Sequence, residues 1–354
     1  MKKFLYCAIF ILLLSSAAFS ETAITSANFP DANFRSYVER FDTNNDGILS
    51  KQEISRVTRM DLSYYGQQED NIGLISNMAG IEYFTALKEL SCGGRGITEL
   101  DVSKNAALEE LSCWDNKIKT LNLRKNSSLE VLSVWSNDIH TLDVSSNIKL
   151  ELLNCNDNHL TKLDLRKNTN LEWLQCINNH ISELDLSGLS KIVYESARLN
   201  EFRADPQYVY GLSFAESNGK YQLDLNKYVN MLSRIKKVSG YLGDDYEYGK
   251  DIQTDYDSSK GIAVFSQKPK SVVYVYDTYL PAGGDMWVTL REGNPTYEEN
   301  LPEENTPENT SESLNSRKSS SGSGGCNAGF SESILLIAIF CLNKKENIER
   351  SCDK

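Results

Sequence analysis

Apolar residues recur with a period of 21 through the middle of the chain. The first position of each unit is apolar from one unit to the next: Leu87, Leu108, Leu129, Leu150, Leu171 and Ile192. Positions 4, 11, 14 and 16 of the units are also apolar. Self-similarity at this spacing predicts a solenoid, in which each unit is one rung and neighbouring rungs share a core. Residues 57–192 are therefore expected to form a repeat domain, with five regular units after an irregular first unit whose strand lies near Met60.

The consensus of the repeat resembles that of a known family. Each unit follows the pattern L-x-x-L-x-C-x-x-N-x-I-x-x-L-D-L-x-x-N-x-x. Over residues 87–192 this resembles the leucine-rich repeat, in the short form found in internalin-like bacterial surface proteins. The resemblance implies parallel strands and a concave face, formed by positions 3, 5 and 7 of each unit, that binds the partner.

Apolar and aromatic side chains gather at these odd positions. Six of them form what we call the concave strip: Trp114, Val131, Trp135, Leu152, Trp173 and Ile177. Because adjacent rungs are about 4.8 Å apart, side chains at equal positions are neighbours. A contiguous exposed apolar surface with tryptophans is typical of a binding interface, so we expect a protein ligand here, or a glycan stacked on the tryptophans. The alternative is that the strip packs against another region of the same chain, the C-terminal region or a neighbouring loop.

Four cysteines share position 6 of their units, and valine takes this position in the third unit. The column reads Cys92, Cys113, Val134, Cys155 and Cys176. Since valine is accepted, the position requires a small apolar side chain, and we expect buried free thiols rather than disulfides or a zinc site. Two columns of asparagines, at positions 9 and 19, are expected to bind backbone groups at the turns.

Position 10 places Asp138, His159 and His180 on consecutive turns, within reach of one metal ion. Exposed histidines on a solenoid edge are commonly only solvated, and we favour this second interpretation.

Both ends of the chain carry targeting patterns. Residues 1–20 combine two lysines, an apolar run and small residues, which predicts an export signal cleaved between Ser20 and Glu21. Residues 291–325 are expected to form an acidic, disordered linker. Residues 326–354 resemble the bacterial C-terminal sorting signals named after Synergistes, which implies processing at Cys326 and attachment by a sorting machinery.

The segment 21–56 carries a calcium-loop pattern. Residues 42–53 read DTNNDGILSKQE, which supplies oxygen atoms at the positions that a twelve-residue calcium loop requires. The expected ligands are the side chains of Asp42, Asn44, Asp46, Ser50 and Glu53 and the backbone carbonyl of Ile48. The segment resembles a single EF-hand flanked by helices, which implies a calcium-binding cap. Because the loop is single and the chain carries an export signal, we expect calcium to stiffen the cap.

Residues 193–290 lose the period and are rich in tyrosine and β-branched residues. Four segments predict strands: 221–225, 261–265, 271–276 and 286–290. They indicate a small β-sandwich-like module, with a helix or loop over 226–238. The expected fold class is mainly β, with a leucine-rich-repeat solenoid between a helical cap and this module.

Charge and composition narrow the function. The chain has 354 residues, with 37 Lys and Arg against 49 Asp and Glu, so its formal net charge is −12. This balance disfavours nucleic acid or an anionic membrane as the main partner. No catalytic residue order recurs with the right spacing. We therefore expect a non-catalytic, monomeric recognition protein at the cell surface, and an extracellular hydrolase is the less favoured alternative.

Overall fold

The computed structural model describes residues 21–64, 73–192, 202–203, 207–243, 251–252, 254–279 and 285–292. By its contacts the chain divides into two units, residues 1–294 and 295–354, and all described residues belong to the first. The export signal with Ser20, the sorting tail with Cys326 and almost all of the linker lie outside the described residues.

The N-terminal cap consists of two short helices around a loop, with a two-stranded antiparallel sheet. Its elements are β1 (Thr22–Ala23), α2 (Ala32–Val38), η1 (Glu39–Phe41), β2 (Ile48–Leu49) and α3 (Lys51–Arg56). The Asp31 side chain caps α2 by accepting hydrogen bonds from two backbone N–H groups. Ser50 and Glu53 form a capping box at the start of α3. Helices therefore flank the loop of residues 42–53 on both sides, as the sequence predicted.

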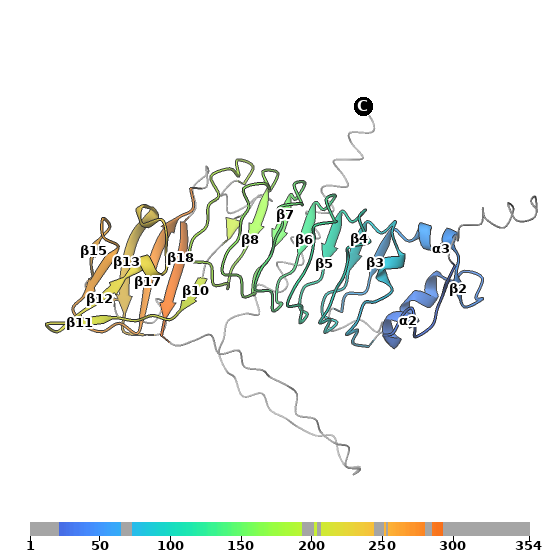
Figure 1. Cartoon of the computed structure of the whole chain (residues 1–354), viewed down its shortest axis with the longest axis horizontal. Helices are drawn as coiled ribbons and strands as arrows, with labels where there is room; N and C mark the ends of the chain where they lie inside the picture. The colour runs from blue at the N-terminus through green and yellow to red at the C-terminus, as the bar shows by residue number, and fades with distance from the viewer. Residues whose placement is uncertain are drawn as a thin grey trace, which may run out of the picture. The chain divides into compact units, whose positions relative to one another are not determined.

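Seven parallel strands stack in chain order into the repeat sheet (Figure 1). They are β3 (Arg59–Asp61), β4 (Glu89–Ser91), β5 (Glu110–Ser112), β6 (Val131–Ser133), β7 (Leu152–Asn154), β8 (Trp173–Gln175) and β9 (Phe202–Arg203). A single turn of 3-10 helix, η2 (Ile81–Tyr83), lies in the irregular first unit. Each strand from β4 to β7 pairs with the residues 21 positions later, as Leu111 pairs with Leu132. The 21-residue period therefore sets the pairing register of the sheet. The sheet continues one strand beyond residue 192.

The core of the repeats lies on one face of this sheet. The apolar residues at positions 1, 4 and 11 are at most 1% exposed. Asparagines at position 9 cross-link the rungs: Nδ2 of Asn137 donates to the carbonyls of Cys113 and Val134, both at 3.0 Å, and its Oδ1 accepts from the N–H of Ile118. The asparagines at position 19 also donate to two carbonyls each, although their Oδ1 atoms have no hydrogen-bond partner in the part of the chain that the structure describes. Both columns therefore satisfy backbone groups, as predicted.

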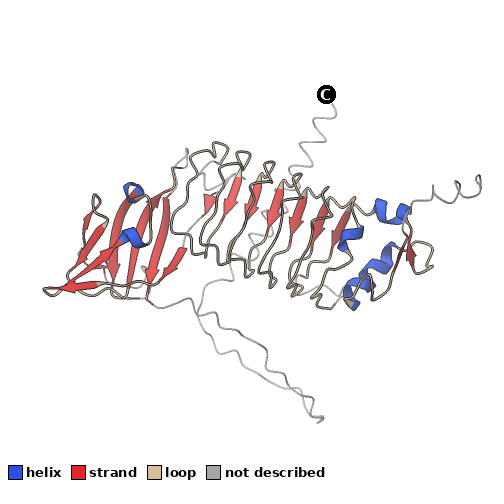
Figure 2. Ribbon diagram, in the orientation of Figure 1, coloured by secondary structure: helices blue, strands red, loops and turns tan. Residues whose placement is uncertain are grey.

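Two sheets form the C-terminal module (Figure 2). The first has the order β10–β18–β17–β13–β14 and the second β11–β12–β16–β15. Their strands are β10 (Gln207–Tyr210), β11 (Ala215–Ser217), β12 (Lys220–Asp224), β13 (Ile235–Tyr241), β14 (Asp251–Ile252), β15 (Thr254–Asp257), β16 (Ile262–Phe265), β17 (Ser271–Asp277) and β18 (Asp285–Arg291). The four predicted strands are present. The start of β13 replaces part of the expected helix or loop, after the short turns η3 (Leu225–Lys227) and η4 (Leu232–Arg234).

Hydrogen bonds join the last repeat to this module. The Tyr274 hydroxyl donates to the carbonyl of Ser182 at 2.7 Å. The side chain of Gln207 continues the asparagine column, because its Oε1 accepts from the N–H of Ile181 and its Nε2 donates to the carbonyl of Cys176. The module thus supplies groups that a further repeat would otherwise provide.

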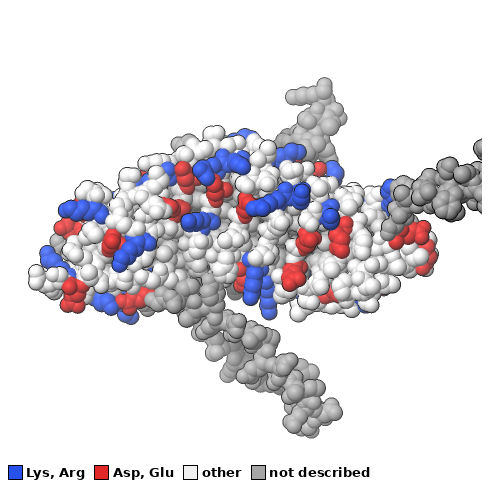
Figure 3. All heavy atoms as spheres, in the orientation of Figure 1, with Lys and Arg blue, Asp and Glu red and all other residues white. Residues whose placement is uncertain are grey.

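Charged side chains of both signs are interspersed over the face of the molecule seen in Figure 3. Within the described part of the chain, no helix has the length and hydrophobicity that crossing a bilayer requires.

Candidate functional site

The loop of residues 42–53 is bound to the N-terminal strand. β1 pairs antiparallel with β2, which covers loop positions 7 and 8. The N–H of Ile24, just after β1, also donates to the carbonyl of Gly47 at 2.9 Å. A segment outside the loop therefore holds the loop backbone in place. This pairing is not evident from the sequence of the loop.

Three of the expected calcium ligands gather in the first half of the loop. The two carboxylate oxygens of Asp42 accept from the backbone N–H groups of Asp46, at 3.3 Å, and Gly47, at 2.8 Å. Nδ2 of Asn44 donates to Oδ2 of Asp46 at 2.9 Å. Gly47 has a φ of +77°, which glycine adopts readily because it lacks a Cβ. The loop therefore turns sharply where the sequence predicted. The side chains of Asn44 and Asp46 meet, and the Asp42 carboxylate binds the backbone of residues 46 and 47.

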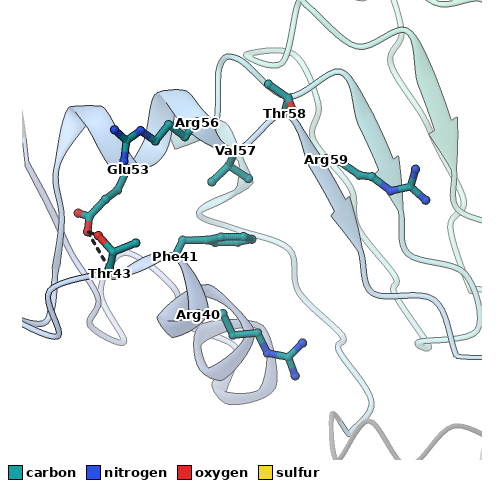
Figure 4. A pocket seen from close by; sticks show the side chains of 8 residues that line it. All are labelled: Arg40, Phe41, Thr43, Glu53, Arg56, Val57, Thr58 and Arg59. Carbon is teal, nitrogen blue, oxygen red and sulfur yellow. Dashed lines mark hydrogen bonds between the residues drawn. The ribbon is translucent and has the colours of Figure 1, made fainter.

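The carboxylate of Glu53 is bound at both ends of the loop. Oε1 accepts from the N–H and the hydroxyl of Thr43, at 2.7 and 2.6 Å (Figure 4), and Oε2 accepts from the N–H and the hydroxyl of Ser50, at 2.9 and 2.8 Å. These donors, with the Thr43 hydroxyl contributing most, lower the pKa of Glu53 to about 2. Glu53 is therefore ionised and fully hydrogen-bonded within the chain.

The loop fits a calcium ion in part. Asp42, Asn44 and Asp46 offer the hard oxygen ligands that calcium prefers. Glu53 would have to give up its bonds to Thr43 and Ser50 before its carboxylate could bind a metal. In the described ranges, no group of three or more His, Cys, Asp or Glu side chains is arranged to hold a metal ion. A calcium ion at the loop would therefore compete with Thr43 and Ser50 for the Glu53 carboxylate.

The concave strip lies on the face of the repeat sheet opposite the core. The register aligns Val131, Leu152 and Trp173 on β6, β7 and β8. Trp114 and Trp135 stack with ring centroids 5.1 Å apart and planes 4° apart. The sequence thus correctly predicted which of these side chains meet.

The strip is not exposed, and this part of the sequence prediction was wrong. The exposed fractions are 5% for Trp114, 4% for Trp135, 2% for Trp173 and 1% for Val131 and Leu152, and only Ile177 is half-buried. The five buried side chains nevertheless lie outside the continuous apolar core of the repeats. Burial increases along the sheet, because the outward residues of β4 and β5 are half-buried whereas every residue of β6, β7 and β8 is buried. The period determines the face to which a side chain points, but not whether that face is covered.

Both faces of the Trp114 ring are occupied. One face stacks on Trp135. The other lies against Gly93, where an added Cβ would overlap the indole ring. Residue 93 is therefore a glycine at a place where the indole leaves no room for a side chain.

Polar side chains run through the strip at position 5 of the units, and they are not among the predicted site residues. Ser133 and Asn154 are 0% exposed and Gln175 is 2% exposed. Gln175 Oε1 accepts from Nδ2 of Asn156 at 3.0 Å, whereas Ser133 Oγ and Asn154 Nδ2 have no hydrogen-bond partner among the described residues. Leaving a buried polar atom unpaired costs about 1–3 kcal/mol. The repeat pattern, which places this position between the two apolar columns, could have identified them.

Asp138, His159 and His180 also come together. Nδ1 of His159 is 3.4 Å from Nε2 of His180, and Nε2 of His159 is 3.7 Å from Oδ1 of Asp138. Nδ1 of His180 bonds to the carbonyl of Tyr208 at 2.7 Å. Burial lowers the pKa of both histidines, and repulsion from His180 and His140 lowers that of His159 further. His159 and His180, which we call the histidine ladder, are half-buried and therefore mainly neutral at physiological pH.

The four cysteines of position 6 are free and buried, as predicted: Cys92, Cys113, Cys155 and Cys176. Burial raises the pKa of the Cys113 and Cys155 thiols to about 12. They therefore remain protonated and poorly nucleophilic.

No known protein family matches the chain, and no curated protein does either. Among solved structures it is similar to InlF, an internalin of Listeria monocytogenes, at 22% identity and a TM-score of 0.43, over 50% of this chain and 52% of InlF. A leucine-rich-repeat protein of Leptospira interrogans is 28% identical, with a TM-score of 0.31, over 32% of each chain. The functional domain of InlJ from Listeria monocytogenes, which includes a cysteine ladder, is 16% identical, with a TM-score of 0.23, over 77% of this chain and 99% of that domain. The chain thus spans about half of InlF and about a third of the Leptospira protein. These similarities concern the fold alone.

Proposed function

We propose that the protein is a non-catalytic recognition protein, whose concave strip binds an apolar segment of a protein partner. The observation that carries this proposal is a pair of apolar columns outside the core, one on β6 to β8 and one formed by the stacked Trp114 and Trp135, with a polar column between them. A solenoid rung buries its leucines on the other face, so folding does not require aromatic side chains here. Tryptophan is strongly enriched among the residues that dominate binding energies.

Binding at the strip requires a rearrangement. The five buried side chains are at most 5% exposed in the single chain, so a partner reaches them only after part of this chain has moved. Once the partner is bound, Ser133 Oγ and Asn154 Nδ2 would pair with polar groups of its backbone. The partner thus gains both apolar contacts and hydrogen bonds at the same face.

A protein ligand is favoured over a glycan. Sugar rings stack on accessible aromatic faces, and both faces of Trp114 are covered, by Gly93 and Trp135. Binding to a glycan array would contradict this choice of ligand. Hydrolysis of a peptide or glycan library, lost on mutation of a single carboxylate, would contradict the non-catalytic role.

The paired substitution Trp114→Ala with Trp135→Ala tests the binding surface. We expect partner capture from native cell-surface material to be lost, because the aromatic stack is removed. The melting temperature should fall less than in a control that removes leucines from the other face of the same rungs, Leu111→Ala with Leu132→Ala. Each buried leucine in a core contributes about 2–5 kcal/mol relative to alanine.

Two results would contradict the proposal. The first is a loss of stability in the tryptophan variant as large as in the leucine variant, which would identify the strip as internal packing. The second is a folded tryptophan variant that captures the same partner as the wild type.

We also propose that the loop of residues 42–53 binds one calcium ion that stiffens the cap. The support is the oxygen-rich spacing of the loop, the turn at Gly47 and the proximity of Asp42, Asn44 and Asp46. Calcium would bind the side chains of Asp42, Asn44, Asp46, Ser50 and Glu53 and the carbonyl of Ile48, after Glu53 has rotated. The hydrogen bonds that Glu53 must break oppose binding, which suits the weak affinities of extracellular modules.

Calorimetric titration of calcium into wild type, Glu53→Gln and the control Glu39→Gln tests this site. Glu39 is an exposed residue on η1 that belongs to no expected ligand set. We expect Glu53→Gln to abolish the binding heat and Glu39→Gln to leave it unchanged. Unchanged binding by Glu53→Gln would overturn the ligand assignment.

Export and attachment remain proposals that rest on the sequence of the two ends. Cleavage before Glu21 predicts a mature chain that begins at that residue, which N-terminal sequencing of the exported protein checks. Processing at Cys326 by a sorting machinery predicts a change in intact mass that Cys326→Ala prevents. An unprocessed tail in the wild-type protein would contradict the anchor.

A further inference from the structure

A pocket of about 270 Å³ lies between the calcium loop and the first strand of the repeat sheet (Figure 4). Phe41 and Val57 occupy its centre. Val57 is 6% exposed, and the half-buried Phe41 packs against Phe84 with ring centroids 5.7 Å apart. We call it the cap pocket. Its volume is below the range of about 300–1,000 Å³ that is usual for small-molecule sites, so it suits a single side chain rather than a cofactor.

Three arginines surround this apolar centre. Arg59 is already paired with Glu89 at 2.7 Å. Arg40 and Arg56 are exposed and lie on opposite sides of Phe41 and Val57. Arg40 stacks over the Tyr37 ring at 4.9 Å, and no carboxylate in the described part of the chain pairs with Arg40 or Arg56. Two uncompensated guanidinium groups therefore flank one apolar pocket in a chain whose net charge is −12.

The acidic residue in the pocket wall does not neutralise these arginines. Both carboxylate oxygens of Glu53 are bound by Thr43 and Ser50. In Figure 4 the carboxylate turns toward Thr43, and Arg40 lies beyond Phe41. Guanidinium groups bind carboxylates well because their planar donor geometry matches two oxygen acceptors.

We propose that the cap pocket binds an acidic peptide segment of a protein partner, which inserts one apolar side chain between carboxylates that pair with Arg40 and Arg56. The apolar centre gains contact area from that side chain. The flanking ion pairs select an acidic sequence and orient it across the pocket. This surface is separate from the concave strip, and the inference does not depend on the function proposed there.

A blocked pentapeptide with leucine between two pairs of glutamates is a direct probe. Its affinity is measured calorimetrically with the full chain in chelator, because a glutamate-rich peptide itself binds calcium. We expect binding that weakens with added salt, since the ion pairs are at the surface. The paired variant Arg40→Gln with Arg56→Gln should weaken binding at least tenfold, and so should replacing the leucine of the probe by serine.

Two further variants keep the result interpretable. Arg124→Gln removes the same kind of charge from an exposed pair with Asp143 on the repeats, and it should leave binding unchanged. Thr58→Glu adds a negative charge at the pocket through an exposed side chain and should weaken binding while both arginines remain.

Four outcomes would overturn the proposal. These are no measurable binding of the probe, equal binding by the Arg40 and Arg56 variant, an equal loss in Arg124→Gln, and displacement of the probe by inorganic phosphate at the same concentration. The last would identify a simple anion site.

Discussion

The proposed calcium loop and the concave strip draw their residues from the chain in opposite ways. The loop takes all its candidate ligands from residues 42–53, whereas the strip draws its residues from four rungs spaced 21 apart. In the strip, the aligned side chains that were expected to meet do meet. In the loop, Asn44 and Asp46 meet, and Asp42 binds the backbone N–H of Asp46. Each region also differs from the expectation in one property. In the loop, the Glu53 carboxylate is hydrogen-bonded to Thr43 and Ser50. In the strip, all side chains except Ile177 are buried. Spacing brings side chains together, but competing neighbours decide what they contact.

We expect the largest effect at the asparagine column of position 9, because its hydrogen bonds connect neighbouring rungs of the repeat domain. Asn137→Ala should lower the free energy of unfolding by about 3 kcal/mol, because it leaves the buried N–H of Ile118 without its partner and removes one of the two donors from each of the Cys113 and Val134 carbonyls. Asn122→Ala is the control, since Asn122 is exposed and accepts only from the N–H of Arg124. Urea unfolding measures both. Equal effects would show that the asparagine columns do not hold the rungs together.

The cysteine column gives a smaller and more selective test. Cys113→Ser should cost about 1–3 kcal/mol, because it places a hydroxyl in a fully buried apolar site. Cys113→Val should cost less than about 1.5 kcal/mol, since Val134 fills the same position in the next rung. The two variants are compared by urea unfolding under reducing conditions. A valine variant less stable than the serine variant would refute the role assigned to this column.

At the calcium loop, the hydrogen bonds of Glu53 predict a dependence on acid pH. The pKa of Glu53 is about 2 in the folded chain and about 4.3 when unfolded, so its stabilising contribution is present above pH 4.3 and is lost as the pH falls toward 2. Calorimetric unfolding between pH 6 and 2, in chelator, should show this loss in the wild type and a flatter profile in Glu53→Gln. Identical profiles would mean that the bonds to Thr43 and Ser50 do not stabilise the metal-free cap.

The histidine ladder should give the smallest effect. The pKa of His159 is lower in the folded chain than its unfolded value of about 6.5, so its contribution is full above that pH and declines as the pH falls below it. His159→Gln should therefore reduce the fall in melting temperature between pH 7.5 and 5.5. An equal fall in both proteins would show that protonation of this ladder is not coupled to folding.

Much of the fold could be predicted from the sequence because five units repeat the same pattern of apolar and polar positions. The strands from β4 to β8, the buried thiols and the asparagine bonds all have fixed places in the 21-residue unit. β1 was missed because a two-residue strand has no periodicity, and its pairing with β2 depends on a distant segment. The start of β13 was missed because short turns precede it in a polar stretch.

The residues that make up the candidate sites could be predicted from the sequence, whereas their burial and their hydrogen bonds could not. The repeat pattern placed Trp135 and Trp173 on the face opposite the core, but it did not indicate that they are only 4% and 2% exposed. The carboxylate of Glu53 accepts hydrogen bonds from the hydroxyl groups of Thr43 and Ser50. The loop sequence alone does not indicate whether these hydroxyl groups bind Glu53 or leave it free to bind calcium. The unpaired atoms of Ser133 and Asn154 became visible only once neighbouring rungs were in place.

Crosslinking from the concave strip tests the central claim most directly. A photoreactive benzoylphenylalanine at Trp173 replaces one buried aromatic side chain by another, and the same group at the exposed Asn122 serves as the control. In cells that display the protein, we predict that residue 173 crosslinks to a second protein and that residue 122 does not. Crosslinks from residue 173 that lead only to other parts of its own chain would contradict a recognition surface and identify the strip as internal packing.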